Sequence, residues 1–179
     1  PVVDKKIPDS CPIYKSLFTS NDIQERFWAN ETYQGMLEKG ILNNQSLKRL
    51  ETEANIIKII SETLNVCLYA YFNTFKYYID LFWEEGSIVG PGRGSATGLL
   101  SNYCLGITQV NPVRWNLAHW RFLNEARIEL PDIDIDLAPS KRKAIFKAIR
   151  EQRGELGLVQ VSTRGTEGTK SAVLTACRG

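Results

Sequence analysis

Three carboxylates recur at every second position in the segment 131–137 (PDIDIDL). On a β-strand, successive side chains point to opposite faces, so Asp132, Asp134 and Asp136 would share one face while the apolar residues point into a core. Carboxylates gathered on one face repel one another unless solvent or cations offset their charge. Such oxygen ligands suit Mg²⁺ or Mn²⁺, and these ions in turn bind phosphates. The segment therefore predicts metal-dependent chemistry on a nucleotide.

A glycine-rich loop lies upstream at 90–95 (GPGRGS), between a short expected strand and an expected helix. At such a junction, backbone N–H groups and the helix dipole favour anionic oxygens. Gly94 allows close approach of the backbone, Ser95 adds a hydroxyl donor, and Arg93 adds a charge-assisted one. Two carboxylates and bridging phosphate oxygens can hold two metals, so loop and carboxylates together favour phosphoryl or nucleotidyl transfer.

Both signals have competing interpretations. The spacing of Gly92, Gly94 and Gly98 also fits a dinucleotide-binding fold, although Pro91 lies in the turn and no acidic residue follows about 20 positions later. The loop does not match GxxxxGK[ST], which disfavours a P-loop NTPase. An exposed edge strand can also alternate Ile and Asp simply to discourage aggregation. The metal site is favoured because Pro131 begins the run and the loop precedes it.

The composition is that of a globular domain, with 43% hydrophobic and 23% charged residues among 179. Charge is unevenly distributed: residues 138–179 hold 9 Lys or Arg against 3 Asp or Glu, whereas residues 1–137 hold 13 against 17. A basic segment of this kind suits a polyanionic partner, or is simply a solvated helix face. The chain opens without methionine and closes just after an expected helix, so we expect a piece of a longer protein.

The cysteines and apolar segments indicate the compartment. The four cysteines are scattered without a CxxC pair, which disfavours a structural zinc site and a disulfide framework. A reducing cytoplasm is therefore expected. No apolar run reaches the length of a membrane span and no signal pattern opens the chain, so no membrane partner is expected. The single histidine, His119, lies in an apolar segment, where packing is a commoner role than ligation.

The elements that must position these residues follow from the periodicity. Helices are predicted over 23–37, from an N-cap at Ser46 through about 60, over 66–83, over 95–105, and from 139 to about 152. Strands are predicted at 87–89, 128–137 and 158–161, followed by a last helix from about 166. The aromatic residues of 66–83 are assigned to a core rather than to base stacking.

Four segments occur in an order and spacing known from one family: 89–96 (VGPGRGSA), 105–108 (LGIT), 121–124 (RFLN) and 131–136 (PDIDID). They resemble the palm of the C-family replicative polymerases, the alpha subunit of bacterial DNA polymerase III. Residues 161–172 resemble the strand and helix that lead from that palm into the thumb. The resemblance is specific from about 81 to 172 and looser before that.

The resemblance implies a fold and a domain organisation. The fold is an α/β (α+β) palm of the nucleotidyltransferase, polymerase beta-like type, with a mixed sheet flanked by helices. The palm would cover residues 1–163, with a helical lead-in over 1–65 and a catalytic sheet region over 66–163. Residues 164–179 would begin a truncated thumb.

The resemblance also implies roles for single residues. The family's two metal-binding aspartates fall on Asp132 and Asp134, with Asp136 a second-rank ligand, and two Mg²⁺ ions are implied, for which Mn²⁺ can substitute. The Gly-Ser pair that touches the incoming triphosphate falls on Gly94 and Ser95. The remaining candidates are Arg93 and Arg121 for the triphosphate, and Lys141, Arg142, Arg164 and Lys170 for the DNA backbone.

The implied activity is that of a bacterial, cytoplasmic DNA-directed DNA polymerase, in which a primer 3′-oxygen attacks the α-phosphorus of a dNTP and pyrophosphate leaves. Primer–template DNA, dNTP and, through missing regions, other replisome subunits are the implied partners. The family's third metal-binding aspartate and its fingers lie beyond residue 179, so the isolated piece is expected to be inactive. Two alternatives stay open: a nucleotidyltransferase acting on a small molecule or an RNA end, and a non-catalytic nucleic-acid-binding module.

The chain departs from the family pattern beside the expected site. His119 and Trp120 stand where Phe-Glu is usual, Glu125 and Ala126 replace Pro-Glu, and Arg164 replaces an aromatic residue. These differences indicate a divergent lineage, in which the aspartate pair and the Gly-Ser pair are intact.

Overall fold

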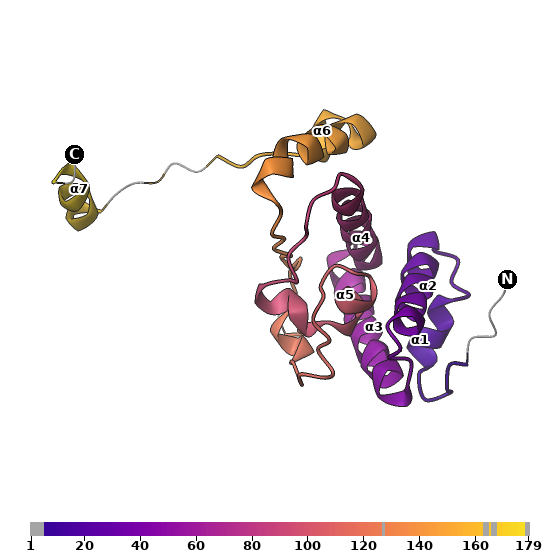
Figure 1. Ribbon diagram of the computed structural model, residues 1–179. Helices are drawn as coiled ribbons and strands as arrows, with labels where there is room; N and C mark the ends of the chain where they lie inside the picture. Colours follow the sequence, from indigo (N-terminus) through magenta and orange to yellow (C-terminus); the bar gives the residue numbers. More distant parts are fainter. Residues whose placement is uncertain (1–5, 127, 163–164, 166–167, 178–179) are drawn as a thin grey trace. The chain divides into compact units, whose positions relative to one another are not determined.

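The computed structural model describes residues 6–126, 128–162, 165 and 168–177 (Figure 1). The chain divides into two compact units, residues 1–145 and 146–179. The expected division into a palm over 1–163 and a thumb from 164 stays a prediction.

Four helices form the core of the first unit. They are α1 (Pro12–Leu17), α2 (Ile23–Glu38), α3 (Asn44–Leu64) and α4 (Leu68–Glu84). Helix α2 packs on α4, and α3 packs on α1 and α4. The aromatic side chains Trp28, Tyr69 and Phe72 are fully buried among them, which confirms Tyr69 and Phe72 of the segment 66–83 as core residues.

Side-chain caps explain where the long helices begin. The Asp22 carboxylate accepts a hydrogen bond from the Gln24 N–H at 2.7 Å and caps α2. The Asn43 side chain accepts from the Ser46 N–H at 2.9 Å and caps α3. The expectation of an N-cap at Ser46 was therefore wrong, because the N-cap is Asn43 and the helix begins three residues earlier.

The glycine loop continues into two short helices rather than one. A 3₁₀-helix, η1 (Gly94–Gly98), is followed by extended Leu99 and then by α5 (Leu100–Cys104). The break lies where the Glu53 carboxylate accepts from the N–H groups of Leu100 and Ser101, the first two residues of α5. The side chain from α3 thus starts a new helix instead of letting the first one continue.

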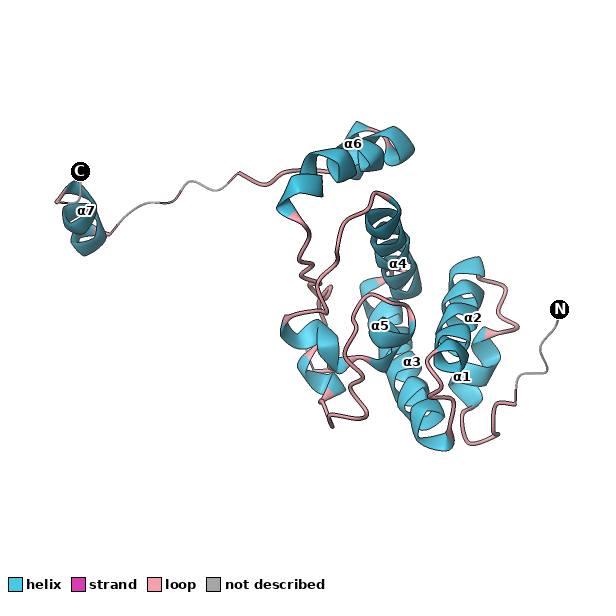
Figure 2. Ribbon diagram, in the orientation of Figure 1, coloured by secondary structure: helices cyan, strands magenta, loops and turns pink. Residues whose placement is uncertain are grey.

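No β-strand is present in the part of the chain that the structure describes (Figure 2). The prediction of a mixed sheet was therefore wrong. The nucleotidyltransferase-like α/β palm was also wrong as a prediction, because it depended on that sheet. One isolated antiparallel bridge joins Val89 to Leu137. A strand needs a continuous neighbouring backbone to pair with, and side-chain alternation alone does not supply one. The expected strand at 158–161 is also absent, and its Val159 and Val161 are 71% and 86% exposed.

The alternation itself is present in the aspartate segment. Asp132, Asp134 and Asp136 are exposed, whereas Ile133 and Ile135 are half-buried. The side chains therefore take opposite faces as expected, although the backbone pairs at only one point.

Helices also form the regular structure of the remaining described residues. A 3₁₀-turn, η3 (Pro139–Lys141), leads into α6 (Arg142–Arg153), which confirms the helix expected over 139–152. The second unit holds the part of α6 after residue 145, followed by η4 (Glu155–Gly157) and α7 (Thr169–Ala176). In the described ranges no helix is both long enough and apolar enough to cross a membrane.

Candidate functional site

The aspartate segment runs antiparallel to the glycine loop. The Gly90 N–H donates to the Asp136 carbonyl at 2.9 Å. Further along, Arg93 Nη1 lies 3.2 Å from Asp136 Oδ1, and Arg93 Nε lies 3.8 Å from Asp134 Oδ2. The structure thus places the predicted carboxylates beside the loop expected to bind phosphate. Because these side chains are exposed, the ion pairs themselves stabilise the fold little.

Two glycines give the loop its backbone path. Gly92 has φ +108° and Gly94 has φ +64°, a region that other residues rarely adopt. A Cβ on Gly92 would also lie 2.9 Å from the Thr108 methyl group and 3.0 Å from that of Thr97. Position 92 therefore favours glycine for both steric and conformational reasons, and position 94 favours it for its backbone conformation.

A cavity of about 350 Å³ brings together residues from three segments. Its lining includes Ser95 from the start of η1, Arg121 from η2 (His119–Arg121), and Asp132. All three were predicted from the sequence, and here a hydroxyl, a guanidinium and a carboxylate line one space. Gly94 directly precedes Ser95 in the chain and lies near Asp134, since a Cβ on it would be 3.8 Å from Asp134 Oδ2.

Three further polar or aromatic residues of the cavity were missed by the sequence reasoning. Trp120, Asn124 and Glu129 line it together with the predicted residues. The Trp120 side chain is 59% exposed there. Asn124 had a signal, because it closes the RFLN segment from which only the arginine was chosen. Trp120 was noted only as a departure from the family pattern, and Glu129 had no signal beyond its nearness to the aspartates.

The donors at this site match the chemistry of a hard divalent cation. Mg²⁺ is commonly bound through one or two carboxylates and completed by substrate phosphates. Asp132 at the cavity and Asp134 beside Gly94 are such carboxylates. In the described part of the chain, no group of three or more His, Cys, Asp or Glu side chains is arranged to hold a metal. Asp132 and Asp134 are thus donors of the kind that Mg²⁺ takes, and the binding of a metal by them stays a prediction.

Helix α4 supports the start of the aspartate segment. The Tyr71 hydroxyl donates a hydrogen bond to the carbonyl oxygen of Pro131, the residue before Asp132. Burial raises the pKa of Tyr71 to about 12, and the nearby Asp132 charge adds to the shift. The neutral phenol therefore stays a donor at physiological pH and ties the segment to the helical core.

The four candidates for DNA contacts are distributed over both compact units of the chain. Lys141 is half-buried at the end of η3, and Arg142 is exposed at the start of α6. Lys170 is exposed on α7, in the second unit. Arg164 lies outside the described residues. Contact of these residues with DNA stays a prediction.

Acidification is expected to destabilise the protein through His119. Burial lowers the pKa of His119, and the nearby Arg49 charge lowers it further, while Glu53 opposes the shift. Because the folded state resists the proton that the unfolded state accepts, stability should fall as pH drops below the ordinary value of about 6.5. Melting temperatures at about pH 7.5 and pH 5.5 test this. His119→Gln should shrink the difference, and an unchanged difference would contradict the assignment.

Comparisons with known proteins agree with the motifs. Residues 3–179 match the family model described as the bacterial DNA polymerase III alpha NTPase domain. The Probable DNA polymerase YorL of Bacillus subtilis (strain 168) is 40% identical over 182 residues, covering 96% of this chain and 14% of YorL. The DNA polymerase III subunit alpha of Thermus aquaticus is 40% identical over 108 residues, covering 60% of this chain and 9% of that protein. The corresponding subunit of Bacillus subtilis (strain 168) is 35% identical over 134 residues, covering 71% and 11%.

The chain thus spans 14% or less of the length of these relatives. The family match nevertheless runs over nearly all of its residues and includes the glycine loop, the RFLN segment and the aspartates. The chain belongs to the bacterial DNA polymerase III alpha family, within its NTPase domain.

Proposed function

We propose that this chain forms the dNTP-binding part of a DNA-directed DNA polymerase. The observation that carries the proposal is the cavity in which Ser95, Arg121 and Asp132 meet. Its volume of about 350 Å³ is in the range of small-molecule sites. The reaction that we propose for the whole polymerase, supported by membership of the family, is transfer of a dNMP from a dNTP to a primer 3′-OH on template DNA.

The chemistry of each residue suits it to a different part of dNTP binding. The Arg121 guanidinium is a charge-assisted donor for phosphate oxygens, and Ser95 offers a hydroxyl from another wall of the cavity. Arg93 adds positive charge next to the aspartates. Asp132 and Asp134 would hold two Mg²⁺ ions, or Mn²⁺ in their place. When bound, these ions activate the attacking oxygen and stabilise the leaving pyrophosphate.

Trp120 supports a nucleotide rather than a bare phosphate as the ligand. Its indole is more than half exposed and lines the same cavity as the phosphate-binding candidates. An aromatic face of this kind stacks on nucleobases, a contact worth about 1–3 kcal/mol per base. A dNTP would therefore find partners for both its phosphates and its base.

Calorimetric titration of dATP into the 179-residue chain, with and without Mn²⁺, tests the proposal. We expect binding that depends on Mn²⁺ and is weakened by about 100-fold or more in Asp132→Asn/Asp134→Asn, because both metal ligands are lost. The matched control is Asp9→Asn/Asp80→Asn, which changes two exposed aspartates that pair only with lysines in the described contacts. This variant should bind dATP as the parent does.

Two outcomes would count against the proposal. Binding of dATP that needs no metal, or that survives in Asp132→Asn/Asp134→Asn, would remove the aspartates from the site. Binding of DNA without dATP or metal would instead favour a non-catalytic nucleic-acid-binding module. We further propose that this chain binds dATP without extending a primer, because the family's third metal-binding aspartate and fingers are expected outside these residues.

A further inference from the structure

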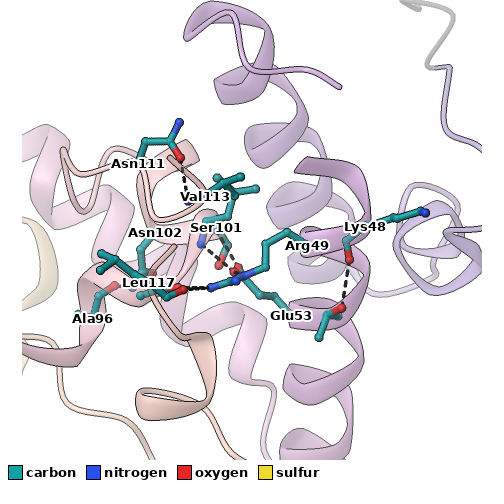
Figure 3. Close-up of polar contacts among 12 residues, drawn as sticks. Lys48, Arg49, Glu53, Ala96, Ser101, Asn102, Asn111, Val113 and Leu117 are labelled. Carbon is teal, nitrogen blue, oxygen red and sulfur yellow. Dashed lines mark hydrogen bonds and ion pairs between the residues drawn. The ribbon is translucent and has the colours of Figure 1, made fainter. Parts of the chain in front are cut away.

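A largely buried ion pair on α3, between Arg49 and Glu53, lies against two loops, which it contacts at Ser101 and Leu117 (Figure 3). Arg49 Nε donates to Glu53 Oε1 at 2.9 Å, one helical turn along α3. The Glu53 side chain is completely buried, and that of Arg49 is 19% exposed. A charge in such a place costs stability unless it is fully paired, so the remaining partners of both groups matter.

Glu53 uses its other contacts to begin α5. Its Oε1 accepts from the Leu100 N–H at 2.7 Å, and its Oε2 accepts from the Ser101 N–H at 2.9 Å. These N–H groups belong to the first turn of a helix and have no partner within it. The carboxylate therefore fixes the segment that directly follows η1.

A second nitrogen of the Arg49 guanidinium, Nη2, binds two loops at once. It donates to the Gly98 carbonyl at 2.6 Å and to the Leu117 carbonyl at 2.9 Å. Gly98 ends η1, the element that carries Ser95, whereas Leu117 shortly precedes η2, the element that carries Arg121. One rigid guanidinium thus binds the backbone at the end of η1 and just before η2.

A second observation shows how closely these loops approach each other. A Cβ on Gly98 would lie 2.7 Å from the Ala118 carbonyl oxygen, so the two backbones are in direct contact there. Arg49 holds the carbonyl groups on either side of this contact. A shift of either loop would break hydrogen bonds to a nearly buried guanidinium.

We propose that Arg49 is a positioning residue, which sets the placement of Ser95 relative to Arg121 by holding Gly98 and Leu117 on one guanidinium. Glu53 orients that guanidinium and anchors the start of α5. The role in dATP binding rests on the proposed function, whereas the holding of the two loops is a property of the fold. A lysine at position 49 would keep the charge and lose the planar fork that reaches several acceptors at once.

Hydrogen–deuterium exchange of the 179-residue chain tests the holding of the loops. In Arg49→Lys, the amides of 94–104 and 117–123 should exchange about tenfold faster, while those of α2 and α4 keep their protection. The matched control is Lys58→Gln, which breaks an exposed pair with Glu62 at the same spacing on the same helix. Unchanged exchange rates in the two loops, or an equal rise of exchange rates throughout the chain, would overturn the proposal.

Affinity for dATP with Mn²⁺ tests whether Arg49 acts through Arg121. Arg49→Lys and Arg121→Ala should each weaken binding about tenfold, and the double variant should be little weaker than Arg121→Ala alone. If the affinity loss of the double variant equals the product of the two single losses, Arg49 acts independently of Arg121. That result would overturn the positioning role. If the parent chain binds no dATP, the proposed function fails, and the exchange result still decides whether Arg49 holds the loops.

A second variant covers the case in which Arg49→Lys does not fold. Arg49→Met/Glu53→Gln removes both charges together, a change that buried ion pairs often tolerate without loss of stability. Faster exchange confined to 94–104 and 117–123 in this folded variant would support the proposal. Parent-like protection of both loops would overturn it.

Discussion

Gly35→Ala is expected to destabilise the first unit by about 3 kcal/mol. A Cβ on Gly35 would lie 2.1 Å from the carbonyl oxygen of Cys104, 2.7 Å from its carbonyl carbon and 2.9 Å from its Cα. These are backbone atoms at the end of α5, so no side chain can rotate to make room. Helix propensity alone predicts the opposite sign, because alanine is favoured over glycine in a helix interior by about 1 kcal/mol.

Urea unfolding measures the effect, and Gln34→Ala provides the control on the same helix. Gln34 is exposed and interacts with Glu38 only on the surface, so its replacement should change the free energy of unfolding by about 0.5 kcal/mol or less. A gain in stability for Gly35→Ala would show that α2 does not approach α5 as described.

Glu53→Ala is the second substitution with a large expected effect, a loss of about 3–5 kcal/mol. It would leave the Arg49 guanidinium without its carboxylate in a mostly buried place. It would also leave the N–H groups of Leu100 and Ser101 without the acceptors that they have now. An unpaired buried donor carries the full cost of its lost hydration.

Glu62→Ala is the matched control for Glu53→Ala. Glu62 lies on the same helix and pairs at 4.0 Å with Lys58, and both side chains are more than half exposed. An exposed pair of this kind contributes about 0.5 kcal/mol. Equal losses for the two variants in thermal or urea unfolding would contradict the burial of Glu53.

The helices were predictable because their signals are local. The spacing of apolar residues predicted helices over 23–37 and 66–83, and the structure has them at Ile23–Glu38 and Leu68–Glu84. The strands failed because pairing depends on a partner that is distant in sequence. For 131–136, alternation correctly predicted which side chains are exposed, but the backbone meets a neighbour only at one bridge.

Motifs predicted candidate residues that lie near one another in the structure, while their roles stay predictions. Ser95, Arg121 and Asp132 came from motifs, and the structure places all three around one cavity. Their support was missed because Arg49 and Glu53 resemble an ordinary surface pair at i and i+4. A signal was nevertheless present, since Glu53 lies three residues after Leu50 and four before Ile57 and so falls on the apolar face of its helix.

The hydrogen bonds from Arg49 determine how short a segment of the chain can be and still form the site. Every motif residue lies at or after position 89, so a shortened chain that starts at residue 66 would retain all of them. It would nevertheless lack the guanidinium that holds Gly98 and Leu117 and the carboxylate that starts α5. Helix α3 is therefore part of the structural unit that forms the site, and a fragment that keeps this unit intact has to begin upstream of α3.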